Sequence, residues 1–134
     1  MENLSQVIFK ELNVYERRRE NLFKLLVVVD DMTNVLEAFH NLPTESDRLR
    51  VKSDIRRLCQ GGTGPKFRES LVGYPKLKEY KAANQHRFFY FRSGGKNIIF
   101  YHHAQKNGKL SDTKLKSIDE TRKLYEDEFK RQNP

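Results

Sequence analysis

Hydrophobic and polar positions near the N-terminus change from a helical to an extended pattern. Over residues 4–19 apolar side chains recur at helical spacing and end at a cluster of arginines, which predicts an amphipathic helix. The run FKLLVVVDD over residues 23–31 is rich in β-branched side chains and too short for a typical helix. It is therefore predicted to form a buried strand.

Two adjacent helices are predicted next. Apolar side chains repeat at helical spacing over residues 35–42, where Pro43 follows, and again over residues 51–58, ahead of two glycines. Thr44 and Asp47 have the spacing of a capping box at the start of the second helix. The Gly-, Thr-, Pro- and Ser-containing segment that follows is expected to be a loop.

The second half of the chain predicts an antiparallel meander and a closing helix. Strands are expected over residues 77–82, 86–92 and 97–104, and a charged amphipathic helix over residues 111–131. The predicted class is α+β, with a helical hairpin on one face of a small antiparallel-rich sheet and additional N- and C-terminal helices. The aromatic side chains of the last two strands are mostly expected to be core, because such a sheet buries alternate residues.

Length and composition restrict the classes of protein. The 134 residues suit one core, and no segment approaches the ~20 consecutive apolar residues of a membrane helix. The N-terminus has no signal-peptide pattern, so a cytoplasmic protein that does not bind membranes is expected. The single cysteine, Cys59, excludes an internal disulfide and a thiolate zinc site.

Positive charge is concentrated in one segment. The chain has a net charge of +8, and residues 76–109 hold eight Lys and Arg residues against the single acid Glu79, together with three of the four histidines. A surface that served solubility alone would mix both signs. This segment therefore favours a polyanionic partner such as a nucleic acid.

The available side chains suit metal-free RNA cleavage. The sequence has no HExxH motif, no carboxylate cluster and no Gly-rich phosphate loop, so neither a metal nor a cofactor is expected. Cleavage by the ribose 2′-OH needs a proton acceptor, a proton donor for the leaving 5′-oxygen and cations for the added negative charge. His, Lys, Arg and Tyr can supply all three.

Several short motifs occur in an order typical of one family. From residue 23 onward a strand and a helical hairpin precede LKEYK (77–81), RFFYF (87–91), IIFYH (98–102) and KNGK (106–109), and a helix follows. In this order and spacing the chain resembles the RelE/ParE superfamily of toxins, within it the HigB-like and phage-derived branch. Residues 1–22 have no counterpart in the usual toxin and are interpreted as an N-terminal helical extension to a RelE-like domain over residues 23–134.

The resemblance implies a function and partners. It implies the toxin of a type II toxin-antitoxin system, a metal-independent mRNA endoribonuclease (an mRNA interferase) that acts on the ribosome. It also implies inhibition by a cognate antitoxin, expected to be of the helix-turn-helix type. Whether the protein is a monomer or a homodimer is left open.

The resemblance and strand geometry together give the candidate site residues. His102 matches the strand-end histidine of the family and is the predicted acid or base, Arg87 the predicted phosphate clamp, and Lys81 a third catalytic candidate. His102 and His103 are adjacent on a strand and should point to opposite faces, and the same argument separates Lys78 from Lys81. The predicted RNA-binding residues are Lys78, Arg92, His103, Lys106 and Lys109.

Two alternatives from other functional classes stay open. A non-catalytic relative of ParE would inhibit DNA gyrase by binding it. A phage or host regulatory module would keep the basic face for RNA or protein and lack catalysis. For each candidate charge, a solvated or structural position is the alternative interpretation.

Overall fold

A six-stranded sheet organises the protein. The computed structural model describes residues 7–12, 23–29, 35–83, 85–105 and 108–134. The strands lie in the order β1-β2-β6-β5-β4-β3, and only β2 and β6 run parallel, whereas every other pair is antiparallel. The elements are β1 (Ile8–Leu12), β2 (Lys24–Val29), α1 (Val35–His40), α2 (Glu45–Cys59), β3 (Phe67–Arg68), β4 (Lys78–Ala83), β5 (His86–Ser93), β6 (Asn97–Gln105) and α3 (Asp112–Gln132).

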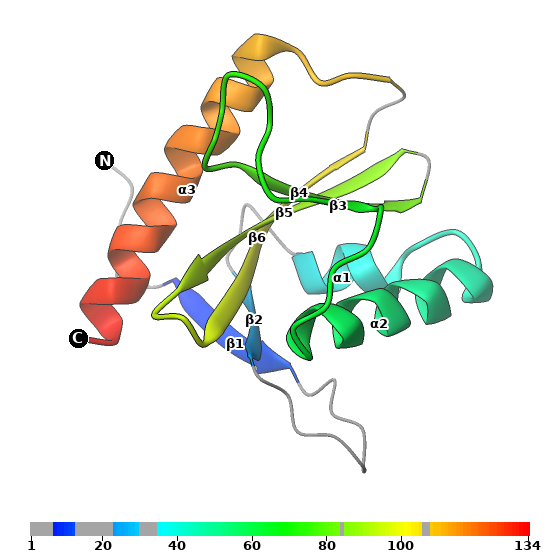
Figure 1. Cartoon of the computed structure of the whole chain (residues 1–134), viewed down its shortest axis with the longest axis horizontal. Helices are drawn as coiled ribbons and strands as arrows, with labels where there is room; N and C mark the ends of the chain where they lie inside the picture. The colour runs from blue at the N-terminus through cyan, green and yellow to red at the C-terminus, as the bar shows by residue number, and fades with distance from the viewer. Residues whose placement is uncertain (1–6, 13–22, 30–34, 84, 106–107) are drawn as a thin grey trace.

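Helices cover both faces of this sheet. In Figure 1, α1 and α2 lie on one side and the long α3 lies on the other. The core is accordingly divided in two, with Phe88 and Phe100 packed towards α1 and α2, and Phe89 and Ile99 packed towards α3. The predicted α+β class is confirmed, and α1 and α2 lie together on one face as predicted. The expectation that the sheet buries only alternate residues is wrong, because α3 covers the other face.

The double cover explains the aromatic runs of β5 and β6. All four residues from Phe88 to Phe91 are at most 1% exposed, so both alternating sets are buried. Tyr90 and Tyr101 are 0% exposed, and burial is the main cause that raises the pKa of both hydroxyls. None of these rings is available to stack on a nucleobase.

The N-terminal prediction is wrong where the structure describes it. Residues 8–12 form strand β1, which pairs antiparallel with β2 through partners such as Phe9 and Val28. Phe9 packs edge-on against Phe129 of α3, with ring centroids 5.0 Å apart. The segment IFKEL does not alternate as a strand does, and pairing with the open edge of β2 outweighs its helical spacing. The other residues of the predicted helix lie outside the described residues, apart from Val7.

The remaining predicted elements are confirmed within a few residues. The Thr44 side chain accepts a hydrogen bond from the backbone N–H of Asp47 at 3.0 Å, as the capping spacing predicted. Ser111 caps α3 in the same way through the N–H of Lys114. Within the described part of the chain, no helix is both long and apolar enough to cross a membrane.

Candidate functional site

The predicted site residues do not form one cluster; they lie at different positions on the two faces of the sheet. Arg87 and His102 lie on the α3 side, whereas His103 lies on the α1/α2 side beside Phe88. Lys78 and Arg92 meet at a third place. Lys109 is exposed before α3, and Lys106 lies outside the described residues.

Arg87 forms a buried ion pair. Its Nη1 donates to Oε2 of Glu79 at 3.2 Å, and the two side chains are only 11% and 3% exposed. Its Nη2 donates to the carbonyl oxygen of Gly108, which holds the segment before α3 against the sheet. The guanidinium that the sequence predicted as a phosphate clamp is therefore engaged by protein groups.

His102 lies on the same face of the sheet as this pair, with Phe89 between it and Glu79 in the strand register. Its ring is near that of Phe89, with centroids 6.0 Å apart, and its Nε2 is buried without a hydrogen-bond partner among the described residues. Burial first, and then the charge of Lys114 on α3, lower its pKa to about 4. At neutral pH the ring is uncharged, so it is a weak base and supplies no proton.

Lys78 and Arg92 share one carboxylate. Arg92 Nη2 donates to Oε1 of Glu69 at 2.9 Å, and Lys78 Nζ lies 3.4 Å from Oε2 and donates to the Glu69 carbonyl at 3.0 Å. Burial raises the pKa of Glu69, but the hydrogen bonds and charges of Arg92 and Lys78 outweigh it and hold that pKa below its usual value. Arg92 also lies over the ring of Phe23, at 5.0 Å from its centroid. These two cations fasten the loop after β3 to the sheet.

Two histidines are directly coupled on the α1/α2 side. His86 begins β5, and His103 lies near the end of β6, pairing with Phe88. Nδ1 of His86 lies 3.0 Å from Nε2 of His103, and the two rings are nearly parallel. One of the two nitrogens must carry the proton of this hydrogen bond. Burial and the neighbouring charge of His86 lower the pKa of His103.

A polar hollow lies against His86. Its volume is about 640 Å³, and it is lined by residues from the start of α2, from the segment before β3, from the hairpin of β4 and β5, and from the end of β6. Among the described residues, three cations line it, Arg50, Lys66 and Lys81, against the single carboxylate of Asp47. The other lining residues are Pro43, Ala83, Gln85, His86 and Gln105.

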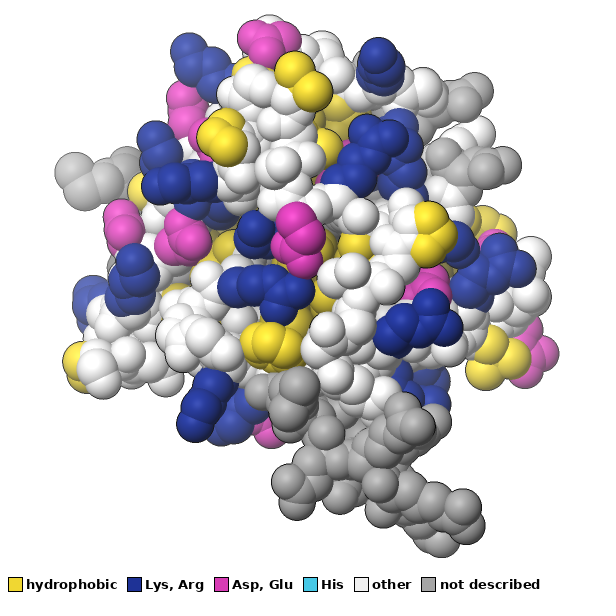
Figure 2. All heavy atoms as spheres, viewed as in Figure 1, with side chains coloured by type: hydrophobic (Ala, Val, Ile, Leu, Met, Phe, Trp, Pro, Cys, Tyr) yellow, Lys and Arg dark blue, Asp and Glu magenta, His cyan; other side chains and the backbone are white. Residues whose placement is uncertain are grey.

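The hollow has the electrostatics of an anion site. Three cations against one acid leave a positive balance, although Lys66 Nζ also lies 3.9 Å from Oδ2 of Asp54. The nearby N-terminal end of α2 also favours negative charge. Since Nδ1 of His86 is occupied by His103, Nε2 is the ring nitrogen left to meet a bound group. Figure 2 shows that elsewhere Lys and Arg side chains are spread across the visible face with Asp and Glu among them, so charge alone does not mark a site there.

Three residues at the hollow were not predicted from the sequence: His86, Arg50 and Lys66. Lys81 was predicted and does line the hollow, but the other two cations come from segments outside the basic run of residues 76–109. The signal for His86 was the pairing of β5 with β6, which brings the first residue of one strand beside the end of the other. That pairing depends on the β-bulge between Phe89 and Tyr90, which the sequence does not reveal.

Comparisons with known proteins found no match, so a function has to be inferred from the geometry of the site. No family model, curated protein or solved structure matches this chain. Among the described residues, no group of three or more His, Cys, Asp or Glu side chains is placed to hold a metal ion.

Proposed function

We propose that the protein is a toxin of the RelE/ParE type that cleaves mRNA without a metal ion, at the hollow beside His86. The observation that carries the proposal is the hydrogen-bonded pair of His86 and His103 at the border of a cationic hollow. The order of elements from β2 to α3 also agrees with the order of motifs on which the resemblance to these toxins rests.

The reaction can be written with these groups. His86 Nε2 takes the proton of a ribose 2′-OH, and the oxygen attacks the adjacent phosphorus as the bond to the 5′-oxygen breaks. The Lys81 ammonium gives a proton to the departing 5′-oxygen, and Arg50 and Lys66 stabilise the added negative charge on the phosphate. The products are a 2′,3′-cyclic phosphate and a 5′-hydroxyl, and solvent returns the proton from His86 to Lys81.

His103 has a positioning role in this scheme. Its hydrogen bond fixes the orientation and tautomer of His86, and it can share the positive charge that His86 acquires. A base with an orienting partner is the arrangement expected for activating a hydroxyl nucleophile.

The test is cleavage of a single-stranded RNA, free and on programmed ribosomes, with EDTA present throughout. We expect His86→Ala to lower the rate by ~100- to 10,000-fold, the range typical of one acid or base. The same RNA with 2′-deoxy sugars should resist cleavage, because it lacks the nucleophile. Growth arrest on expression should be lost in the same variant.

The matched variant is His102→Gln on the opposite face. Since His102 lies outside the hollow, cleavage at neutral pH should change far less than in His86→Ala. Full cleavage by His86→Ala, or a larger loss in His102→Gln, would contradict the assignment of the site.

A second candidate is a non-catalytic module of the same fold, which binds RNA or a protein such as DNA gyrase. It is favoured by the engagement of Arg87 with Glu79 and Gly108, since the residues that match the toxin motif are not free. Specific RNA binding or gyrase inhibition without any cleavage, in the same assays, would select this candidate.

A further inference from the structure

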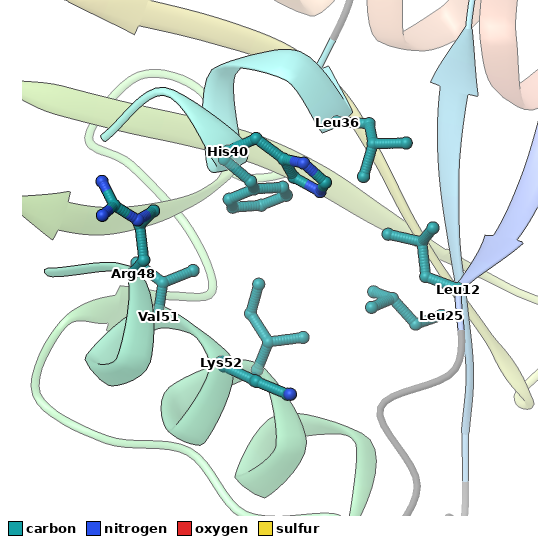
Figure 3. A pocket seen from close by; sticks show the side chains of 9 residues that line it. Leu12, Leu25, Leu36, His40, Arg48, Val51 and Lys52 are labelled. Carbon is teal, nitrogen blue, oxygen red and sulfur yellow. The ribbon is translucent and has the colours of Figure 1, made fainter. Parts of the chain in front are cut away.

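An apolar pocket lies between the sheet and the helical hairpin, apart from the hollow at His86. Its volume is about 490 Å³, within the range of pockets that bind small molecules. Figure 3 shows Leu12 and Leu25 on one side, Leu36 and His40 on a second, and Val51 and Lys52 on a third. Four elements, β1, β2, α1 and α2, therefore contribute to one concavity.

The floor of the pocket is aliphatic and aromatic. Leu25 is 2% exposed, Val51 and Ile55 are each 4% exposed, and Phe39 is 9% exposed. Side chains of the hydrophobic core therefore form the floor of the pocket. Such a floor favours a hydrocarbon or ring system over a polar ligand.

Among the described residues, the polar side chains at this pocket are all basic types. His40, Arg48 and Lys52 line it, and no carboxylate of the described part of the chain does. Arg48 and Lys52 are one turn apart on α2, so their charges repel each other on the same face of the helix. Arg48 Nη1 donates to the Leu42 carbonyl at 2.7 Å, whereas Lys52 makes no ion pair with the described residues. A bound anion would relieve this repulsion.

We infer that this pocket binds a small anionic amphiphile, with an apolar body against Leu25, Val51 and Ile55 and a carboxylate at Arg48 and Lys52. Medium-chain carboxylates have this chemistry. The inference is independent of the proposed RNA cleavage, because the pocket and the hollow have no lining residue in common.

The first experiment titrates the full chain with decanoate below its micelle concentration, by calorimetry and by NMR of the methyl groups. We expect saturable binding with shifts at Leu25, Leu36, Val51 and Ile55. Decyltrimethylammonium has the same chain length and the opposite charge, and it should bind at least about tenfold more weakly. Equal affinity for the two probes, or shifts spread over the α3 side as well, would overturn the inference.

Three variants sharpen the result. Lys52→Glu should weaken decanoate binding about tenfold, whereas Lys123→Glu makes the same charge change at an exposed position of α3 and should leave it unchanged. Leu36→Trp fills the pocket from a partly exposed position and should abolish binding without lowering the melting temperature. Unchanged affinity in Lys52→Glu would overturn the role of the cations. RNA cleavage measured on the same variants reports the proposed function separately.

Discussion

The two sides of the sheet at β4, β5 and β6 hold similar side chains that face different surroundings. On the α3 side, Arg87 and Glu79 are paired and buried, and burial lowers the pKa of His102. On the α1/α2 side, His86 is also buried, at 9% exposed, but it borders a hollow with Lys81, Arg50 and Lys66 around it. The comparison teaches that availability for chemistry depends on what lies next to a residue rather than on its type.

The pairing register of the strands explains why residues close in sequence lie in such different surroundings. Glu79, Phe89 and His102 are successive cross-strand partners in the middle of the sheet, where α3 packs. His86 instead pairs with Gln105, at the ends of β5 and β6. Adjacent residues of one strand face opposite sides, so His103 joins His86 while His102 does not.

The largest effect on stability should come from breaking the buried pair on the α3 side. Glu79→Ala leaves the guanidinium of Arg87 buried without its carboxylate, and we expect a loss of about 3–5 kcal/mol in the free energy of unfolding. Urea denaturation followed by circular dichroism measures this loss.

The control is the double variant Glu79→Leu with Arg87→Met, which removes both charges and keeps the volume. It should regain most of the stability lost by Glu79→Ala, since no unpaired charge stays buried. A double variant as unstable as the single one would show that the ion pair itself, and not the unpaired charge, carries the stability.

The next largest effect should be a dependence on pH. The pKa of His102 is lower in the folded protein than in the unfolded chain, so the unfolded chain takes up the proton first as the pH falls. This contribution to stability is complete above about pH 6.5 and is lost towards pH 4. Between pH 7 and pH 4.5 the loss should be about 2 kcal/mol.

His102→Gln isolates this contribution. The variant cannot titrate at that position, so its stability should fall less steeply with acidification than that of the wild type. The measurement is the free energy of unfolding at several pH values at constant ionic strength. Parallel pH profiles would contradict the burial of a neutral imidazole at this position.

The smallest effect on stability should occur at the hollow. Arg50 is exposed, so Arg50→Gln should change the free energy of unfolding by less than about 0.5 kcal/mol. If Arg50 contacts a phosphate, the slope of log affinity against log salt for single-stranded RNA should become shallower by about 0.7. An unchanged slope would exclude a phosphate contact by Arg50.

The sequence predicts local structure here better than it predicts the site. Strand β2, the cap at Thr44 and the meander follow from periodicity and capping, because these depend on near neighbours in the chain. Strand β1 does not, since its formation depends on the open edge of β2. The hollow depends on three features that involve residues far apart in the sequence. These are the register of β5 and β6, the helices over both faces, and the approach of α2 and Lys66 to the β4–β5 hairpin.

The parallel pairing of β2 with β6 sets when this protein can fold during its synthesis. Leu25 pairs with Ile98, so the centre of the sheet joins segments from the first and last thirds of the chain. Until β6 has left the ribosome, β2 has only β1 beside it and both hydrophobic cores lack their central strand. Pairing across such a sequence separation also slows folding, because a long loop must close first. A nascent chain that ends before residue 97 therefore lacks the fold, and the hollow forms only after β6 has been synthesised.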